Sequence, residues 1–570
     1  MNQGKMDIPG FSVRPLAIQA IPNKNAANSM RMYPTLSLVG RQCGPAGILA
    51  ILFCLLLAPA ALAWQSDLGD GRYQNPVLFA DYSDPDVIRV GSNFYMVSSS
   101  FHFMPGIPIL TSKDLVNWTI IGHVYSRFEF DPAYNLTGGD GDRYGAGCWA
   151  PAIRYHAGLF RVYFPTPNEG IFMSTAKSAA GPWSPLVQVK KVSGWEDPCP
   201  FWDDDGKAYL VHSVLGAGPL ILHRMSADGT QLLDDGTNIV QDPDNLPVLE
   251  GPKIYRMRGY YYIFAPAGGV GQGWQAVLRS KNIYGPYKSR KVLDQGDTAI
   301  NGPHQGAYVE TPDGQPWFVH FQSRDAYGRI FWLEPVKWTD DWPVIGSAPA
   351  GATTGHPVLT WAKPEIKGRT PIQIPQTSDE FNSSKLGLQW EWNHNPDDSK
   401  WSLTGRHGYL RLRAAPAESL VHARNTLTQM LADPAVIITT LLDSRKMADG
   451  QRAGLCMLGD PAGWIGVAQT EGRQQIGCFT ANHETLGPTI SSSSIYLRMN
   501  VDNGIATFSY SLDGNTFVAD GDPVKLRSSW WKGARPGLFS FNTAGQPPQS
   551  TGAADFDWFH YEPKTPATGK

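Results

Sequence analysis

The sequence has little cysteine and no surplus of either charge. Six cysteines in 570 residues are too few for a disulfide framework. Basic residues (48) nearly balance acidic ones (51), so no nucleic-acid partner is indicated. A glycine-rich phosphate loop, a zinc-ligand motif and a serine-centred elbow are all missing. These absences exclude a disulfide-stapled module and the enzyme classes that such motifs define.

Long hydrophobic runs are also scarce. The one present covers residues 46–63 (AGILAILFCLLLAPAALA) and ends in Ala61-Leu62-Ala63. This pattern predicts a secretory signal with an A-x-A cleavage site. A permanent anchor is the alternative, which Pro59 and the polar residues after the run disfavour. We therefore expect a lead and signal over residues 1–63, and a secreted or periplasmic protein without membrane attachment after cleavage.

Four cysteines would remain after cleavage: Cys148, Cys199, Cys456 and Cys478. Cys456 and Cys478 could pair in one disulfide. Two separate buried thiols are the alternative, and the sequence leaves both open.

Glycine (59), proline (45) and aromatic residues (11%) are abundant, as is typical of turn-rich β proteins. From residue 73 to about 346, one pattern recurs: a glycine turn, an aromatic-rich strand and a second strand. Its leading glycines are Gly91, Gly158, Gly206, Gly259 and Gly314. Five units with room for four short strands each predict a five-bladed β-propeller over residues 71–363.

A second β domain is predicted after the repeats. Residues 364–377 include a proline-rich stretch without helical periodicity, which indicates a semi-rigid linker. Over residues 378–563, short alternating strands are separated by turns such as Asn503-Gly504. They predict a β-sandwich. Within the propeller, residues 126–147 lengthen the first interval and are expected to form a loop at its mouth.

Three carboxylates lie near the starts of repeat units, where the innermost strand of a blade faces the central channel. They are Asp84 (first unit), Asp197 (third unit) and Glu250 (fourth unit). Each is followed by proline directly or after one glycine, which restricts the backbone. Singly these are ordinary turn sequences. Together they would converge on one axis, where mutual repulsion must raise the pKa of at least one carboxyl group.

These residues resemble glycoside hydrolase family 43, whose members are five-bladed propellers acting as β-xylosidases, α-L-arabinofuranosidases and arabinanases. The resemblance implies an all-β chain in which residues 378–563 form a concanavalin-like β-sandwich. The motifs that carry it are Asn75-Pro76, Ser83-Asp84-Pro85-Asp86, FHFMPG at 101–106, Trp149-Ala-Pro151, Glu250-Gly-Pro and Tyr327-Gly-Arg329.

The resemblance implies a role for each carboxylate. Asp84 would be the general base, Glu250 the general acid, and Asp197 the residue that positions the acid and raises its pKa. Glu196 stands directly beside Asp197, and Asp197 is preferred because it precedes proline. Arg329 would bind Asp84 and sugar hydroxyls. Inverting hydrolysis needs one protonated and one ionised carboxyl group, about 6.5–9.5 Å apart.

Aromatic residues are expected to hold the sugar. Phe101 and Trp149 match positions that line the sugar subsite in the family, with packing inside the propeller as the alternative. Trp274 lies in a glycine-rich turn and is predicted to line the mouth or to belong to a plain surface loop.

Two sites are candidates for a metal ion. His304 opens the fifth unit and matches a histidine that binds a central calcium or hydrated ion in many relatives; a neutral, hydrogen-bonded histidine is the alternative. In the sandwich, Glu380 and Asp557 would meet at a structural calcium or form a surface pair.

We therefore expect an exported, exo-acting glycoside hydrolase that inverts configuration and releases xylose or arabinose from hemicellulose-derived oligosaccharides. Its chemistry would need no cofactor. A non-catalytic sugar-binding propeller is one alternative, although it would not need three convergent acids. A retaining fructan-type hydrolase is another, although its characteristic opening motif is missing. The family also implies that a sandwich segment, residues 541–552, caps the pocket. The sequence does not separate xylose from arabinose and does not predict the oligomeric state.

Overall fold

The computed structural model describes residues 63–564, without 138–140, 217, 369 and 544–551. The expected signal lies almost wholly outside these residues and stays a prediction. In the described part, no helix is long and apolar enough to cross a membrane. Its helices are single short 3-10 turns: η1 (Pro132–Asn135), η2 (Asp325–Tyr327), η3 (Asp398–Lys400) and η4 (Leu420–His422).

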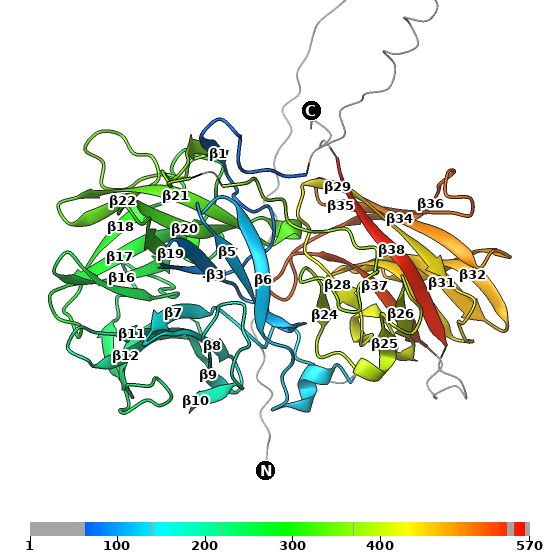
Figure 1. Cartoon of the computed structure of the whole chain (residues 1–570), viewed down its shortest axis with the longest axis horizontal. Coiled ribbons are helices and arrows are strands. Elements are labelled where there is room, and N and C mark those ends of the chain that lie inside the picture. Colours follow the sequence, from blue (N-terminus) through cyan, green and yellow to red (C-terminus); the bar gives the residue numbers. More distant parts are fainter. Residues whose placement is uncertain (1–62, 138–140, 217, 369, 544–551, 565–570) are drawn as a thin grey trace, which may run out of the picture. The chain divides into compact units, whose positions relative to one another are not determined.

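Five four-stranded antiparallel sheets form the blades of a propeller (Figure 1), which confirms the predicted fold. The five repeated glycines lie in the turns between the first and second strands of the blades, with φ between 62° and 81°. Glycine adopts this left-handed conformation without steric cost, so its recurrence marks the blades.

The blade strands follow chain order. They are β2 (Asp86–Val90), β3 (Asn93–Val97), β5 (Gly106–Ser112) and β6 (Trp118–Tyr125); β7 (Ala152–His156), β8 (Leu159–Thr166), β9 (Gly170–Ala176) and β10 (Val187–Lys191); β11 (Trp195–Trp202), β12 (Ala208–Val214), β13 (Leu220–Met225) and β14 (Thr237–Val240); β15 (Lys253–Met257), β16 (Tyr260–Ala267), β17 (Trp274–Ser280) and β18 (Lys288–Leu293); β19 (His304–Glu310), β20 (Pro316–Ser323), β21 (Arg329–Thr339) and β22 (Trp342–Ile345).

The two ends of the propeller are joined to each other. Strand β1 (Arg72–Gln74) pairs antiparallel with β23 (Thr360–Ala362). Next to it, the side chain of Asn75 donates hydrogen bonds to the carbonyls of Leu333 and Val358. These contacts fix the segment that leads from β1 to Asp84.

The C-terminal domain is a sandwich of two β-sheets. One contains β24 (Glu391–Asn393), β27 (Ala415–Pro416), β28 (Leu427–Thr428), β30 (Gln451–Leu458), β31 (Gly463–Thr470), β32 (Arg473–Thr480), β33 (His483–Thr489) and β37 (Arg535–Asn542). The other contains β25 (Trp401–Ser402), β26 (Leu410–Arg413), β29 (Ala435–Asp443), β34 (Ser494–Asp502), β35 (Ile505–Ser511), β36 (Val518–Lys525) and β38 (Ala553–Pro563).

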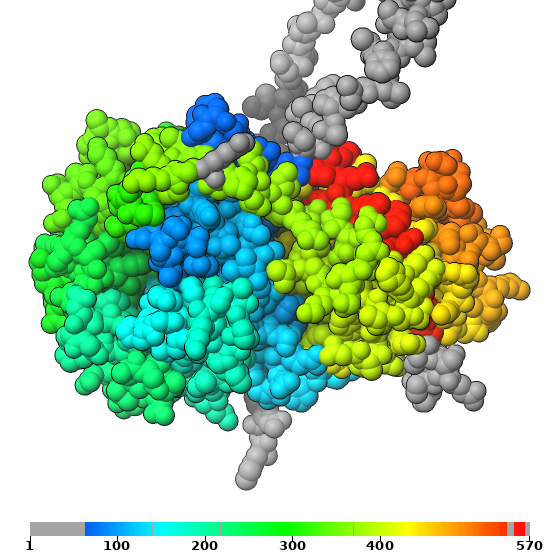
Figure 2. Space-filling view, in the orientation of Figure 1, coloured from blue at the N-terminus to red at the C-terminus, as the bar shows by residue number. Residues whose placement is uncertain are grey.

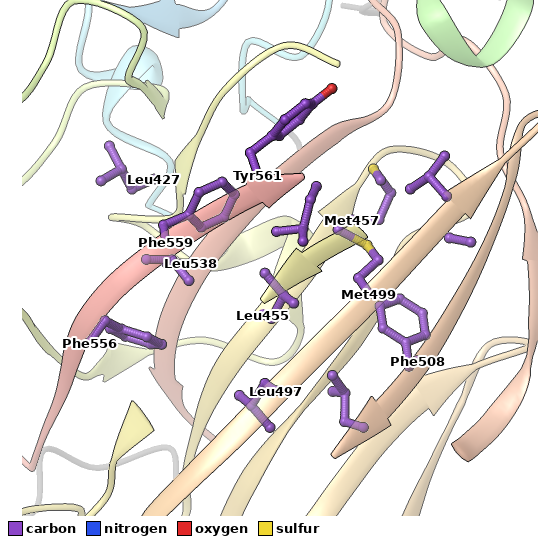
Figure 3. Close-up of a cluster of buried hydrophobic side chains, with 14 of the residues drawn as sticks. Leu427, Leu455, Met457, Leu497, Met499, Phe508, Leu538, Phe556, Phe559 and Tyr561 are labelled. Carbon is purple, nitrogen blue, oxygen red and sulfur yellow. The ribbon is translucent and has the colours of Figure 1, made fainter. Parts of the chain in front are cut away.

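Apolar side chains from the two sheets fill the space between them. In Figure 3, Leu455 and Met457 of β30 lie opposite Leu497 and Met499 of β34. Cys456 and Cys478 are both buried and free, as are Cys148 and Cys199. The alternative of separate thiols is therefore correct, and the disulfide is not formed.

The propeller and the sandwich share one hydrophobic core. Strand β4 (Phe103–Met104) leaves the first blade and pairs with β24 of the sandwich. Phe79 and Trp332 of the propeller belong to the same buried cluster as Trp390 of the sandwich. The two domains are therefore parts of one compact unit.

The insertion at residues 126–147 also packs on the sandwich. The backbone of Phe128 exchanges hydrogen bonds with the side chain of Asn395, at 2.9 and 2.7 Å. The hydroxyl of Tyr144 donates to the carbonyl of Val421. Figure 2 shows this part of the chain in cyan against the yellow-green residues of the sandwich.

A different sandwich segment from the expected one reaches the propeller. Residues 544–551 of the predicted cap lie outside the described residues, and Phe541 is a strand residue that pairs with Arg452 inside the sandwich. The cap at residues 541–552 therefore stays a prediction, and residues 528–534, between β36 and β37, contact the propeller. Lys532 is buried against the propeller, and Ala534 N donates to the carbonyl of Ala326 at 2.8 Å.

The shared core predicts that the propeller does not stand alone. A fragment of residues 64–365 would expose Phe79, Phe103 and Trp332, each of which contributes about 1.5–3 kcal/mol when buried. Since whole domains are stable by only about 5–15 kcal/mol, we expect a lower melting temperature and loss of soluble monomer. Thermal unfolding and size-exclusion chromatography of the fragment and the full chain measure this. A soluble, monomeric fragment with an unchanged melting temperature would contradict it.

Candidate active site

Asp84 lies just before β2 with its backbone in the left-handed region, at a φ of 51°. Its Oδ1 accepts a hydrogen bond from Arg329 Nη1 at 2.7 Å, and its Oδ2 accepts one from Ser99 Oγ at 2.5 Å. The side chain is buried. Both oxygens therefore face donors, which is the environment that a carboxylate needs in order to act as a base.

Asp197 comes from the third blade, but it lies inside β11 and not ahead of it as expected. There the pairing with β12 shifts register, and the φ of Asp197 is 56°. Its Oδ2 accepts hydrogen bonds from Gly251 N (2.7 Å), Gln305 Nε2 (3.0 Å) and Ser213 Oγ (3.3 Å). Burial, and next the negative charge of Glu250, raise the pKa of Asp197 to about 7.

Glu250 precedes β15 of the fourth blade and faces His304, whose Nε2 lies 2.8 Å from Glu250 Oε1. Burial acts to raise the pKa of Glu250, but the hydrogen bond and charge of His304, with the charge of Arg329, hold it below its ordinary value. The sequence predicts a raised pKa on Glu250, whereas the structure has it on Asp197. The physical reason is His304, which stabilises the charged form of Glu250.

Asp197 and Glu250 form a closely spaced pair. Carboxylate oxygens of Glu196, Asp197 and Glu250 lie within 4.8 Å of one another. Glu196 is thus near as well, but the hydrogen bond from Gly251 N joins Asp197 to the residue next to Glu250. With one pKa raised to about 7 and the other lowered, the pair holds one proton below neutral pH.

The residues proposed to bind calcium lie at two places, and metal binding at both stays a prediction. The Nδ1 of His304 is buried without a hydrogen-bond partner, so one ring nitrogen is left for a ligand at the axis. Calcium takes six to eight oxygen ligands, and a single nitrogen suits a water molecule better. In the sandwich, Glu380 bonds to His560 at 2.7 Å. Within the described residues, the one group of three acidic, histidine or cysteine ligands contains neither Glu380 nor Asp557.

The structure places Phe101 and Trp149 close to residues of the sandwich, and Trp274 against a lysine of its own blade. Phe101 is buried, with the Lys532 ammonium 5.8 Å from its ring centre. The indole of Trp149 donates to the carbonyl of Gly145 at 2.8 Å, and Trp149 is half-buried. Trp274 instead packs under the ammonium of Lys291, 4.3 Å from its ring centre. Trp274 is the first residue of strand β17 and thus not part of a plain surface loop, and its place at the mouth stays a prediction.

One aromatic residue of this region was not predicted. Trp531 of the sandwich lies 6.4 Å from Trp149, centre to centre, and 5.7 Å from the guanidinium of Arg329. Its side chain is 55% exposed, so one face is available to a ligand. The adjacent pair Trp530-Trp531 was the available signal, and nothing local in it pointed to the propeller.

Comparison with known proteins shows the family to which this chain belongs. The model of glycosyl hydrolases family 43 matches residues 73–343, and the β-xylosidase C-terminal concanavalin A-like domain matches residues 378–562. A protein of Xylanibacter ruminicola is 45% identical over 477 residues, 83% of this chain and 87% of that protein. The chain belongs to glycosyl hydrolase family 43.

Two further relatives in the family span nearly the whole chain. A β-xylosidase of Formosa agariphila is 36% identical, over 89% of this chain and 93% of that enzyme. A non-reducing end α-L-arabinofuranosidase of Bacteroides ovatus is 28% identical, over 90% of this chain and 98% of that enzyme. This family 43 chain is accordingly a glycosyl hydrolase with both domains of such enzymes.

The shared proton predicts the alkaline side of the pH profile. The pKa of Asp197, raised to about 7, means that the pair gives up its last proton as the pH rises through 7. We expect kcat/KM for an unactivated glycoside to fall above that pH. In Asp197→Asn the proton that Asp197 holds up to about pH 7 is lost, and only Glu250, whose pKa lies below its ordinary value, remains to hold one, so the alkaline limb should move to lower pH. A pH–rate series measures this, and an unmoved limb in the variant would count against the pairing.

Proposed function

We propose that this glycosyl hydrolase is an exo-acting β-xylosidase or α-L-arabinofuranosidase, releasing single pentoses from hemicellulose-derived oligosaccharides. The observation that carries the proposal is the different surroundings of three carboxylates, of which Asp84 and Asp197 are buried and Glu250 is half-buried. Asp84 is held by two donors, whereas Asp197 and Glu250 share one proton. An inverting glycosidase needs this combination of one ionised and one protonated group.

The proposed mechanism follows from the contacts. Asp84 accepts a proton from a water molecule as that water attacks the anomeric carbon, and Arg329 holds the carboxylate in place. Glu250 donates a proton to the leaving oxygen. Because Glu250 is deprotonated more readily than Asp197, the role of Asp197 is to keep a proton available to the pair and to restrain the backbone beside Glu250 through Gly251.

The exo action is proposed from the sandwich residue at the site. Trp531 approaches both Trp149 and Arg329 from the second domain. A ring in that position restricts the room for a continuing polysaccharide chain and offers a flat face to a sugar. The segment that bears it, residues 528–534, would cap the site in addition to any cap formed by residues 541–552. Secretion, with cleavage after residue 63, is part of the same proposal.

Both alternatives are less favourable. A sugar-binding propeller without activity would have to bury Asp84 and Asp197 beside the half-buried Glu250 at energetic cost without using them. A retaining fructan-type enzyme would need Asp84 as a nucleophile attacking carbon directly. Arg329 and Ser99 occupy one oxygen each, which favours a positioned base.

The substrate and the stereochemistry can be tested together. The full chain should hydrolyse 4-nitrophenyl β-D-xylopyranoside, 4-nitrophenyl α-L-arabinofuranoside or both, and should release pentose from chain ends. Proton NMR at early times should show the product anomer inverted relative to the substrate. Retention would instead require a covalent intermediate and would revive the fructan-type mechanism. Turnover of neither glycoside would overturn the proposed specificity.

The roles of Asp84 and Glu250 should differ in their dependence on the leaving group. Asp84→Ala and Glu250→Ala should each lower kcat by about 10²–10⁴-fold on an unactivated xylobioside. An activated aryl leaving group needs little protonation, so it should restore much of the rate of Glu250→Ala and hardly any of Asp84→Ala. Circular dichroism checks that both variants are folded. Equal losses on the two substrates would contradict the assignment.

A further inference from the structure

We propose that Lys532, a residue of the sandwich, is a positioning residue for the general base in the propeller and acts through Asp81. The inference rests on the role proposed for Asp84. It gives the second domain a part in placing the catalytic carboxylate, beyond covering the sugar.

Lys532 inserts its ammonium into the propeller. The side chain is 1% exposed, and its Nζ donates to Asp81 O (2.8 Å), Ser99 O (3.1 Å) and Ser83 Oγ (3.2 Å). All three acceptors belong to the other domain, and together they satisfy the three donors of the ammonium. A buried ammonium is costly unless it is paired and fully hydrogen-bonded, so these contacts fix the position of the segment.

Two of these acceptors adjoin the base. Ser83 precedes Asp84 in the chain, and the hydroxyl of Ser99 donates a hydrogen bond to Asp84 Oδ2 at 2.5 Å. Lys532 therefore restrains the peptide that carries Asp84 and the serine that orients its carboxylate. It does both without touching Asp84 through a hydrogen bond of its own.

Asp81 connects Lys532 to the second donor of the base. Its Oδ1 accepts hydrogen bonds from Ser83 Oγ (2.9 Å) and Arg329 N (2.8 Å). Its Oδ2 accepts one from Gly533 N (2.9 Å) and lies 3.5 Å from Lys532 Nζ. One buried carboxylate thus joins the base segment, the segment bearing Arg329 and the sandwich segment.

Close backbone packing leaves this junction little freedom. A Cβ atom on Gly533 would lie 2.6 Å from Gly328 N and from the carbonyl carbon of Tyr327. A Cβ on Gly328 would lie 2.3 Å from the carboxylate carbon of Asp81. Both glycines allow the sandwich segment to meet the Arg329 segment backbone to backbone. A shift of the sandwich is therefore transmitted to both donors of Asp84.

The test compares Lys532→Met, which removes charge and donors, with Lys532→Gln, which keeps two donors. We expect kcat to fall about 10–100-fold with KM changed less than threefold, because displacements near 1 Å are enough for such losses. The matched control is Arg127→Met, which removes another cation that crosses the domain boundary, to Asp398. It should keep wild-type kinetics.

A pH profile separates positioning from a loss of folded enzyme. The charged and titratable groups facing Asp84 are Arg329, Lys532, Asp197 and Cys148. Removing the Lys532 cation leaves the negative charge of Asp84 less compensated. The acid limb of kcat/KM should therefore move to higher pH in Lys532→Met. A smaller folded fraction would scale the profile without moving it. Asp81→Asn should lower kcat to a similar extent, but it removes a negative charge, so its acid limb should not move to higher pH. The double variant with Lys532→Met should lose little more kcat than either single variant.

The outcomes distinguish this inference from the proposed function. If wild-type enzyme is active and Asp84→Asn is inactive, while both Lys532 variants keep the kcat and acid limb of Arg127→Met, this inference alone is overturned. If Asp84→Asn retains wild-type turnover, the base assignment fails and the inference fails with it. If Lys532→Met does not fold, Lys532→Gln must still show the shifted limb and Asp81→Asn must still show the lowered kcat, and wild-type behaviour of both variants would refute the proposal.

Discussion

The burial of like charges at the propeller axis is the constraint on which the rest of the site depends. Asp84, Asp197 and Glu250 come from three blades. The negative charges of Glu250 and Asp84 both act on Asp197 and raise its pKa. Three negative charges cannot be buried together without compensation. Arg329 pairs with Asp84 and His304 with Glu250, whereas burial and the charge of Glu250 raise the pKa of Asp197 to about 7. The roles proposed for the three carboxylates thus follow from how each charge is compensated.

The same constraint explains why the two domains behave as one body. Part of the compensation for the base segment comes from Lys532, so a propeller without its sandwich would lose a buried cation as well as apolar partners. Hydrophobic burial holds the domains together without direction, whereas the hydrogen bonds of Asp81 define their register. Hydrophobic contacts therefore hold the two domains together, and the hydrogen bonds of Asp81 set the positions of the residues at the site.

The sequence was sufficient to predict the propeller because its signal is local and repeated. Each blade needs a glycine at one turn, and Gly91, Gly158 and their counterparts report it directly. Asp84 and Glu250 could be found because proline follows them at strand entrances. Asp197 was found by the same rule, although it lies within a strand at an irregular register, which no local pattern encodes.

The contacts between domains could not be predicted in this way. Lys532 and Asp81 are separated by 451 residues, and neither stands in a motif. The family resemblance implied a cap at residues 541–552, most of which lie outside the described residues. Residues 528–534 contain two tryptophans and a lysine, which give no local indication of their partner. The distribution of the pKa shifts also depended on His304, whose approach to Glu250 is a tertiary contact.

Two of the three carboxylate residues have a strained backbone conformation. Asp84 and Asp197 both have φ above 50°, a conformation that costs a non-glycine residue about 1–3 kcal/mol. Such strain persists only where surrounding contacts determine it, and here each residue is held by hydrogen bonds to its carboxylate. Trp530 and Trp531 are also left-handed, at 53° and 68°. The strained residues of the described site thus lie in both domains, and the packing that fixes them joins the two domains across the shared core.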